Sequence, residues 1–396
     1  MANQLNRRNW IKSSALMAGG ITFFSNSVSG LLAKPIGKPV ASEFKKSFTI
    51  SEQELMTLAP PNLGVMKARL LANENPFGPS VKAKKAIEAA MDSSYQYPFI
   101  YYGQLVDKIA AFEGVKKENI MLDAGSSPLL LAAAIHFSKN GASIITADPS
   151  YDDLPKKAAE VGGKIVHVPL TTDYKIDLDA MEKSIDNSTS LMYVCNPNNP
   201  TATVLDSTKL KAFCERVSKK IPVFVDEAYI DYLPNPQAVT MIDAVKKGQN
   251  VIVARTFSKL YGFAGLRIGY IVAQPEMLKT LSKYTQGSMS ISATTLQAAI
   301  ASFQDREFLD DALAKTLASK QFLYETLKKE GYDYIPSSTN FVMFQLKMDG
   351  QKFVSEMMKR SVGVRFWKFN DKDWCRVSIG RMDEMQAFAD AFKQLS

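Results

Sequence analysis

The run ARTFSKLYGFAGLRIGYIVA, residues 254–273, decides how the rest of the chain is interpreted. It continues VIV at 251–253, a short β-branched segment that predicts a buried strand. Beyond this strand lie hydroxyl side chains, a lysine and an arginine that follows a glycine-containing turn, namely Thr256, Ser258, Lys259 and Arg267. Hydroxyls and an arginine suit a phosphate, and a lysine among them can condense with an aldehyde. The segment therefore predicts a site for a phosphorylated aldehyde.

Two upstream clusters of polar residues also follow apolar runs. The cluster NPNNPT at 196–201 follows the run 191–194, and DEAY at 226–229 follows the run 223–225. Each cluster is therefore expected just past the end of a strand. In open α/β sheets, ligands bind at that edge. We expect the three segments to meet at one site.

The ordered set NPNNPT, DEAY, SK and GLRIGY resembles the motifs of the fold-type-I, pyridoxal-phosphate-dependent (class I/II) aminotransferases, and most closely their histidinol-phosphate aminotransferase-like group. The resemblance extends from about Leu71 to the C-terminus. It implies an α/β fold of the aspartate-aminotransferase type, with a mostly parallel central sheet in a large domain and a smaller α+β C-terminal domain. It also implies pyridoxal 5'-phosphate as cofactor and ping-pong transamination between an amino donor and a 2-oxo acid acceptor.

The resemblance assigns the chemistry to a few residues of this chain. Lys259 would bond to the cofactor's aldehyde and, once released, move the substrate proton as a base. Asp226 would lie beside the ring nitrogen and keep it protonated, so that the ring withdraws electrons. Tyr229 and Asn199 would hydrogen-bond the 3-oxygen of the ring. The other cofactor contacts implied are Ser126, Ser127, Tyr151, Thr256, Ser258, Arg267 and Tyr97.

These further contacts each have a physical reason. A Gly-Ser-Ser turn at the start of a helix, which includes Ser126 and Ser127, offers free N–H groups to an anion. Relatives often carry an acidic residue near this point, which this chain lacks. Tyr151 can stack on the ring. Tyr97 stands where the family has a tyrosine that reaches the phosphate of the other subunit, which implies a homodimer with a shared active site.

Three residues are expected to contact the substrate. Arg376, in WCRVSIG, resembles the arginine that binds the substrate's α-carboxylate. Arg365, in VGVR, loosely matches an arginine that helps to hold the substrate's phosphate in the histidinol-phosphate enzymes. Asn75 belongs to NENPFGPS, which resembles the segment at the mouth of the active site. Ala202 stands where the family has glycine, and a positive φ there would cost on the order of 1 kcal/mol.

Composition narrows the class of protein. The chain has 396 residues, of which 46% are hydrophobic and 22% charged, as in ordinary globular proteins. Its net charge of +8 is not arranged as a basic stripe interleaved with aromatics, which argues against nucleic acid as a partner. Three cysteines without CxxC spacing and only two histidines argue against a metal site.

The N-terminus resembles a bacterial twin-arginine signal. Arg7 and Arg8 precede a weakly apolar stretch at 13–24, which is too short and too rich in serine and glycine for a membrane anchor. A basic tail followed by an amphipathic helix is the alternative. We expect export by the twin-arginine machinery to the periplasm. The predicted organisation is a signal at 1–33, an arm at 34–70, a large cofactor-binding domain at 71–290 and a small domain at 291–396.

Two other functions remain open from the sequence. The same scaffold and cofactor contacts serve related decarboxylases and lyases, because they do not fix which bond at the substrate's α-carbon breaks. A catalytically silent binding protein is the third possibility, against which Lys259, Asp226 and Arg376 argue. Histidine synthesis is cytoplasmic, so the expected export and the histidinol-phosphate likeness point in different directions. The identities of donor and acceptor are left open.

Overall fold

A seven-stranded sheet carries the motifs at its edge. Its order is β2-β8-β7-β6-β5-β3-β4. Strands β3 to β7 are parallel, and β8 runs antiparallel to both of its neighbours. The strands are β2 (Ile120–Asp123), β3 (Ser143–Asp148), β4 (Lys164–Pro169), β5 (Thr189–Cys195), β6 (Val223–Asp226), β7 (Val251–Thr256) and β8 (Gly269–Val272). The prediction of a mostly parallel sheet in an aspartate-aminotransferase-like fold is confirmed.

Helices cover both faces of this sheet, which is why its central strands are continuous apolar runs. One face packs against α5 (Ser127–Phe137), α6 (Asp153–Glu160) and α11 (Pro275–Leu281). The other packs against the remaining helices of this region. These are α3 (Val81–Ala90), α4 (Phe99–Glu113), α7 (Leu178–Lys183), α8 (Ser207–Val217), α10 (Ile242–Lys246) and α12 (Ala293–Ser302), with the short α9 (Pro236–Val239) nearby.

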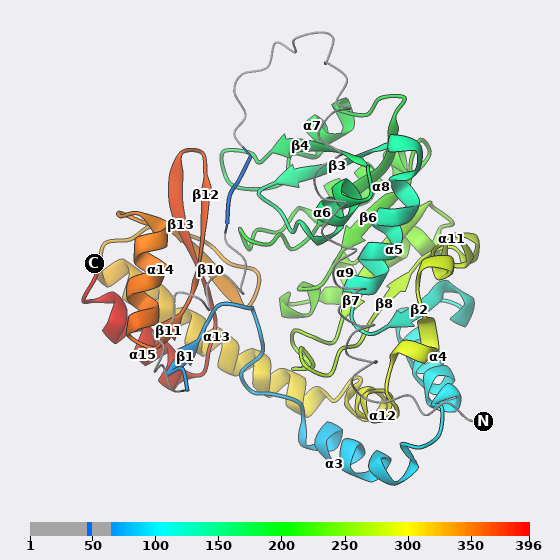
Figure 1. The fold of residues 1–396 in the computed structure, drawn as a ribbon, viewed down its shortest axis with the longest axis horizontal. Helices are drawn as coiled ribbons and strands as arrows, with labels where there is room; N and C mark the ends of the chain where they lie inside the picture. The colour runs from blue at the N-terminus through cyan, green and yellow to red at the C-terminus, as the bar shows by residue number, and fades with distance from the viewer. Residues whose placement is uncertain (1–45, 50–64) are drawn as a thin grey trace, which may run out of the picture. The chain divides into compact units, whose positions relative to one another are not determined.

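A four-stranded sheet of order β12-β13-β10-β9 forms the smaller region, visible in orange in Figure 1. Its strands are β9 (Tyr334–Ile335), β10 (Phe341–Gln345), β12 (Arg365–Phe369) and β13 (Lys372–Ser378), covered by α14 (Gly350–Lys359) and α15 (Met382–Phe392). A parallel pair, β1 (Ala68–Arg69) and β11 (Val362–Gly363), adjoins it.

The long helix α13 (Arg306–Lys329) connects the two cores. Its Leu309 and Ala312 join the core of the large sheet, whereas Leu323 and Leu327 join that of the small one. The preceding α12 also packs into the large core. The chain therefore changes core within α13.

The computed structural model describes residues 46–49 and 65–396. The predicted signal at 1–33 and most of the predicted arm at 34–70 lie outside these residues. Within them, no helix combines the length and the apolar character that a membrane crossing requires.

Candidate active site

A cavity of about 340 Å³ opens at the carboxyl ends of β5, β6 and β7 and is bounded on its other side by β12 and β13. It gathers most of the residues predicted from the sequence. These are Ser126, Ser127, Tyr151, Asn199, Asp226, Tyr229, Thr256, Ser258, Lys259, Arg267, Arg365 and Arg376. Because parallel strands end at a common edge, segments far apart in the sequence meet here.

Two predicted residues do not line this cavity. Asn75 is buried, but its amide donates to the carbonyl of Leu260 at 2.6 Å, and its side-chain oxygen accepts from the amide of Phe77 at 3.0 Å. Tyr97, just before α4, is 73% exposed. Its role at the site of another subunit stays a prediction.

Asn73 takes a place at the cavity that the sequence did not assign. Its backbone has a φ of 55°, and its amide donates to the hydroxyl of Tyr229 at 3.0 Å. Its carbonyl oxygen is 3.4 Å from Nζ of Lys259, which lies 5.2 Å from the centre of the Tyr229 ring. Asn73 belongs to the NENPFGPS segment, but motif likeness did not indicate which of its asparagines faces the lysine.

Asp226, the last residue of β6, is 1% exposed. Its Oδ1 accepts from the amide of Ala228 and its Oδ2 from the hydroxyl of Tyr193, both at 3.1 Å. Burial raises the pKa of Asp226 to about 6, and the two hydrogen bonds oppose that rise. A carboxylate in this environment can pair with a protonated ring nitrogen.

The phosphate end of the cavity lies at the start of α5. Gly125, with a φ of 92°, lets the chain turn there, and a Cβ at this position would collide with the guanidinium of Arg267. Nη1 of Arg267 donates to Oγ of Ser258 at 3.4 Å. Thr256 accepts from the amide of Ser258 at 3.1 Å. Hydroxyls, a guanidinium and the amino end of a helix thus converge, as an anion site requires.

Arg376, on β13, brings the small sheet to the cavity. Its Nη1 donates to the side-chain oxygen of Asn199 at 2.7 Å and its Nη2 to the carbonyl of Leu71 at 2.6 Å. This bond orients the side chain of Asn199 by engaging its oxygen. The amide nitrogen of Asn199 can then donate to a ligand. The guanidiniums of Arg376 and Arg365 lie 4.7 and 4.8 Å from the centre of the Trp367 ring.

A second cavity, of about 420 Å³, adjoins the first and shares Tyr151, Asn199, Arg365 and Arg376 with it. Residues 46–49 form part of its wall. The amide of Ser47 donates to Asp148 at 2.8 Å, and Oγ1 of Thr49 donates to the carbonyl of Phe366 at 2.6 Å. These bonds tie the described N-terminal segment to both sheets, beside the cavity that Arg365 and Arg376 also line.

The loop that carries Asn199 contains the departure from the family pattern. Ala202 has a φ of 61°, so alanine occupies a left-handed conformation there. Its methyl group is fully buried, and its carbonyl accepts from the amide of Ser338 at 2.8 Å. A positive φ at this alanine was expected to cost on the order of 1 kcal/mol, and the structure shows that positive φ.

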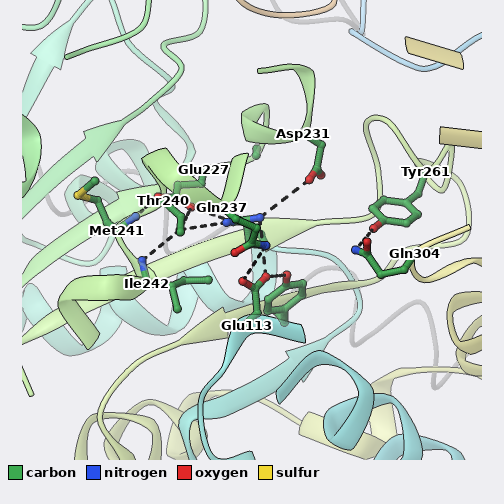
Figure 2. A network of polar contacts seen from close by, with 12 residues as sticks. Glu113, Glu227, Asp231, Gln237, Thr240, Met241, Ile242, Tyr261 and Gln304 are labelled. Atoms are coloured by element: carbon green, nitrogen blue, oxygen red, sulfur yellow. Dashed lines mark hydrogen bonds and ion pairs between the residues drawn. The ribbon is translucent and has the colours of Figure 1, made fainter. Parts of the chain in front are cut away.

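The opposite face of the sheet holds a cluster of buried charges, which we call the Arg255 cluster (Figure 2). Nε of Arg255 donates to Glu227 at 2.8 Å, and Glu227 also accepts from Thr240 at 2.8 Å and from the amide of Met241 at 2.6 Å. Glu113 lies 3.8 Å from the guanidinium. Burial opposes the charge of Arg255, but the carboxylates, Glu227 foremost, raise its pKa above the ordinary value.

These features fit pyridoxal 5'-phosphate. The glycine at 125 leaves the arginine and the helix end open to a phosphate, and the buried Asp226 offers a carboxylate to a ring nitrogen. Lys259 provides an amine in the same cavity. The residues present therefore supply each group that the cofactor needs.

Comparisons with known proteins agree with this site. The model of the family "Aminotransferase class I and II" matches residues 65–392. The chain is 33% identical to a histidinol-phosphate aminotransferase of Moorella thermoacetica over 83% of this chain and 85% of that protein. The structure of the Sinorhizobium meliloti histidinol-phosphate aminotransferase in complex with pyridoxal-5'-phosphate covers 88% of this chain and 95% of its own, with a TM-score of 0.80 and 27% identity. A Porphyromonas gingivalis L-threonine-O-3-phosphate decarboxylase, covering 82% of this chain and 98% of its own, has a TM-score of 0.70 at 19% identity, which shows the fold alone.

Proposed function

Because this chain belongs to the class I and II aminotransferases and is a pyridoxal-phosphate-dependent transaminase, we propose a substrate class for it: primary amines that carry an anionic group. The observation that carries the proposal is the pair of guanidiniums, Arg365 and Arg376, over the ring of Trp367. Both line the two adjoining cavities. Arginine binds carboxylate and phosphate through two oxygens at once, so either anion suits this wall.

Histidinol phosphate is the first substrate to test. The Moorella relative is named for it, and the compound combines a primary amine with a phosphate. The 2-oxo acid acceptor would place its carboxylate on Arg376 in the other half-reaction. The second cavity, of about 420 Å³, gives the side chain of either partner a place to extend.

Each residue at the site has a definite task in this reaction. The bound cofactor supplies an aldehyde and an electron-withdrawing ring. Lys259 would hold the cofactor through its amine, and that amine, when free, would move the substrate's α-proton on Nζ. Asp226 would hold the proton on the ring nitrogen, and the amide of Asn199 and the hydroxyl of Tyr229 would orient the ring oxygen. Arg267 and Ser258 would anchor the phosphate.

A panel of half-reactions tests the substrate class. Purified enzyme is mixed with histidinol phosphate, histidinol, glutamate, aspartate or alanine, and the change in cofactor absorption is followed by stopped flow. We expect the donors that carry an anionic group, namely histidinol phosphate, glutamate, aspartate and alanine, to react faster than histidinol, which carries none. Equal rates for histidinol and histidinol phosphate would contradict the proposal. Release of carbon dioxide would indicate a decarboxylase instead, and Lys259→Ala, which removes the reacting amine, is the inactive control.

We also propose a homodimer with shared active sites. The segment around the start of α4 exposes Tyr95, Tyr97, Phe99 and Ile100, and each side chain is more than half exposed. Exposed apolar side chains at this density mark interaction surfaces, and the family likeness gives Tyr97 a role at the partner's site. Mixing inactive Lys259→Ala subunits with Tyr97→Ala subunits should restore part of the activity, because one site of the hybrid then has both residues. No restoration after verified exchange would argue against sharing.

Export by the twin-arginine route to the periplasm of a bacterium remains our proposal for location, supported by Arg7, Arg8 and the weak apolar stretch that follows them. Replacement of Arg7 and Arg8 by lysine should keep the chain in the cytoplasm. Fractionation measures this directly. A wild-type chain found at full length in the cytoplasm would contradict the proposal.

A further inference from the structure

Tyr193 is a buried tyrosine whose hydroxyl contacts the proposed partner of the ring nitrogen. It lies in β5 and has no exposed surface. The hydroxyl donates to Oδ2 of Asp226 at 3.1 Å, which is its one hydrogen bond within residues 46–49 and 65–396. Asp226 lines the cofactor cavity, whereas Tyr193 is absent from its described lining. Tyr193 therefore supports Asp226 from behind the cavity wall.

Strand alternation places the two side chains together. In the pairing of β5 with β6, Tyr193 lies opposite Phe224 and Cys195 lies opposite Asp226. Side chains two residues apart in a strand share a face, so all four belong to the cofactor face of the sheet. The ring of Tyr193 packs against Phe224 at a centroid distance of 5.8 Å. A phenylalanine would fill this space equally well, so packing does not explain the hydroxyl.

The hydroxyl has an electrostatic use in this position. A buried hydroxyl is unfavourable unless it is hydrogen-bonded, and its bond to an ionised carboxylate is stronger than its bond to a neutral acid. The other oxygen of Asp226 accepts from the amide of Ala228 at 3.1 Å. Both oxygens are thus held, which fixes the plane of the carboxylate and leaves its other lone pairs for a ligand.

We propose that Tyr193 is a positioning residue for transamination, whose hydroxyl orients the carboxylate of Asp226 and favours its ionised form at the ring nitrogen. The inference rests on the cofactor and on the role proposed for Asp226. It requires no particular substrate, and so it goes beyond the substrate class proposed above.

The charge of Asp226 depends on several surrounding groups. The titratable side chains that face it are Tyr151, Asp153, Tyr193, Cys195, Tyr229 and Lys259. Burial is the largest influence and raises the pKa of Asp226 to about 6, and Asp153 adds to the rise. The bonds from Tyr193 and Ala228 lower that pKa, as does the charge of Lys259. Without the Tyr193 hydroxyl, the effect of burial is less opposed.

The test measures the titration of Asp226 in the apoenzyme by infrared difference spectroscopy of the protonated carboxyl group. The Asp226→Asn variant identifies the band. In Tyr193→Phe we expect the midpoint to rise by about one pH unit, and the affinity for added pyridoxal 5'-phosphate near pH 6 to fall about fivefold. The matched control is Tyr232→Phe, because the hydroxyl of Tyr232 is buried without a hydrogen-bond partner in the described residues. Its midpoint should equal that of the wild type.

An unchanged midpoint in folded Tyr193→Phe overturns the proposal, and so does an equal shift in both variants. Should Tyr193→Phe not fold, 3-fluorotyrosine is incorporated in place of Tyr193, which keeps the ring and strengthens the donor. The midpoint should then fall, and no change overturns the proposal. Because no amine substrate enters these measurements, a failure of the proposed substrate class in the half-reaction panel is distinguishable from a failure here.

Discussion

Asp226 and Glu227 are adjacent acids that the fold directs to opposite faces of one sheet. Asp226 lines the cofactor cavity and accepts two hydrogen bonds from the protein. Glu227 belongs to the Arg255 cluster, where Arg255, Thr240 and the amide of Met241 engage both of its oxygens. Both acids are 1% exposed. Burial alone therefore does not mark a functional acid; the carboxylate that faces a cavity with lone pairs to spare is available for chemistry.

The largest expected effect is on the cofactor face. Asp226→Asn keeps the shape but removes the charge that holds the ring nitrogen protonated, so the half-reaction rate should fall by roughly a hundredfold to a thousandfold. The apoenzyme should not lose stability, because the change removes a buried charge. Stopped-flow rates and thermal denaturation of the apoenzyme measure the two quantities. If Asp226→Asn retained the wild-type rate, the charge of Asp226 would not have the role that we assign to it.

The matched change on the other face, at Glu227, should lower stability more than it lowers the half-reaction rate. Glu227→Gln weakens the pairing of buried Arg255 and should lower the free energy of unfolding by roughly 3 kcal/mol. Denaturant unfolding measures this loss. The rate per cofactor-loaded site should change less than in Asp226→Asn. If Glu227→Gln were as stable as the wild type and equally impaired as Asp226→Asn, the two faces would not differ as we propose.

The dependence of apoenzyme stability on pH sharpens the contrast. The pKa of Asp226 is raised by burial from 3.8 to about 6 in the folded state. The unfolded chain therefore releases this proton first, and the contribution of Asp226 is complete below about pH 4 and is lost as the pH rises through 6. The loss is on the order of 3 kcal/mol. The difference in unfolding free energy between wild type and Asp226→Asn, measured from pH 4 to 7, should show this slope; a flat difference would contradict it.

The smallest expected effect concerns the loop beside Asn199. Ala202→Gly relieves a left-handed alanine and should raise the free energy of unfolding by up to about 1 kcal/mol. The control is Ala132→Gly within α5, where glycine should instead lower it by about 1 kcal/mol. Denaturant unfolding of both variants gives the comparison. A loss of stability in Ala202→Gly would mean that the buried methyl group contributes more than the backbone strain.

Much of the fold was predictable because most strands of the large sheet are apolar runs followed by a turn. The strand expected at 223–225 is observed at Val223–Asp226. Tyr193 and Arg255 were not recognised, although the alternation within β5 and β7 assigns each to a face. The alternation of side chains along a strand indicates which residues share a face of the sheet. It does not indicate which of those residues are in contact.

The sequence by itself determined the family, the cofactor and the order of motifs along the sheet edge, because strand ends and turn residues are local features of the chain. Only the tertiary structure decided the partners. Arg376 meets Asn199 across 177 positions of sequence, and Asn73 rather than Asn75 faces Lys259. Such contacts depend on how the two regions joined by α13 pack against each other. The whole core sets that packing, and no single segment of the sequence does.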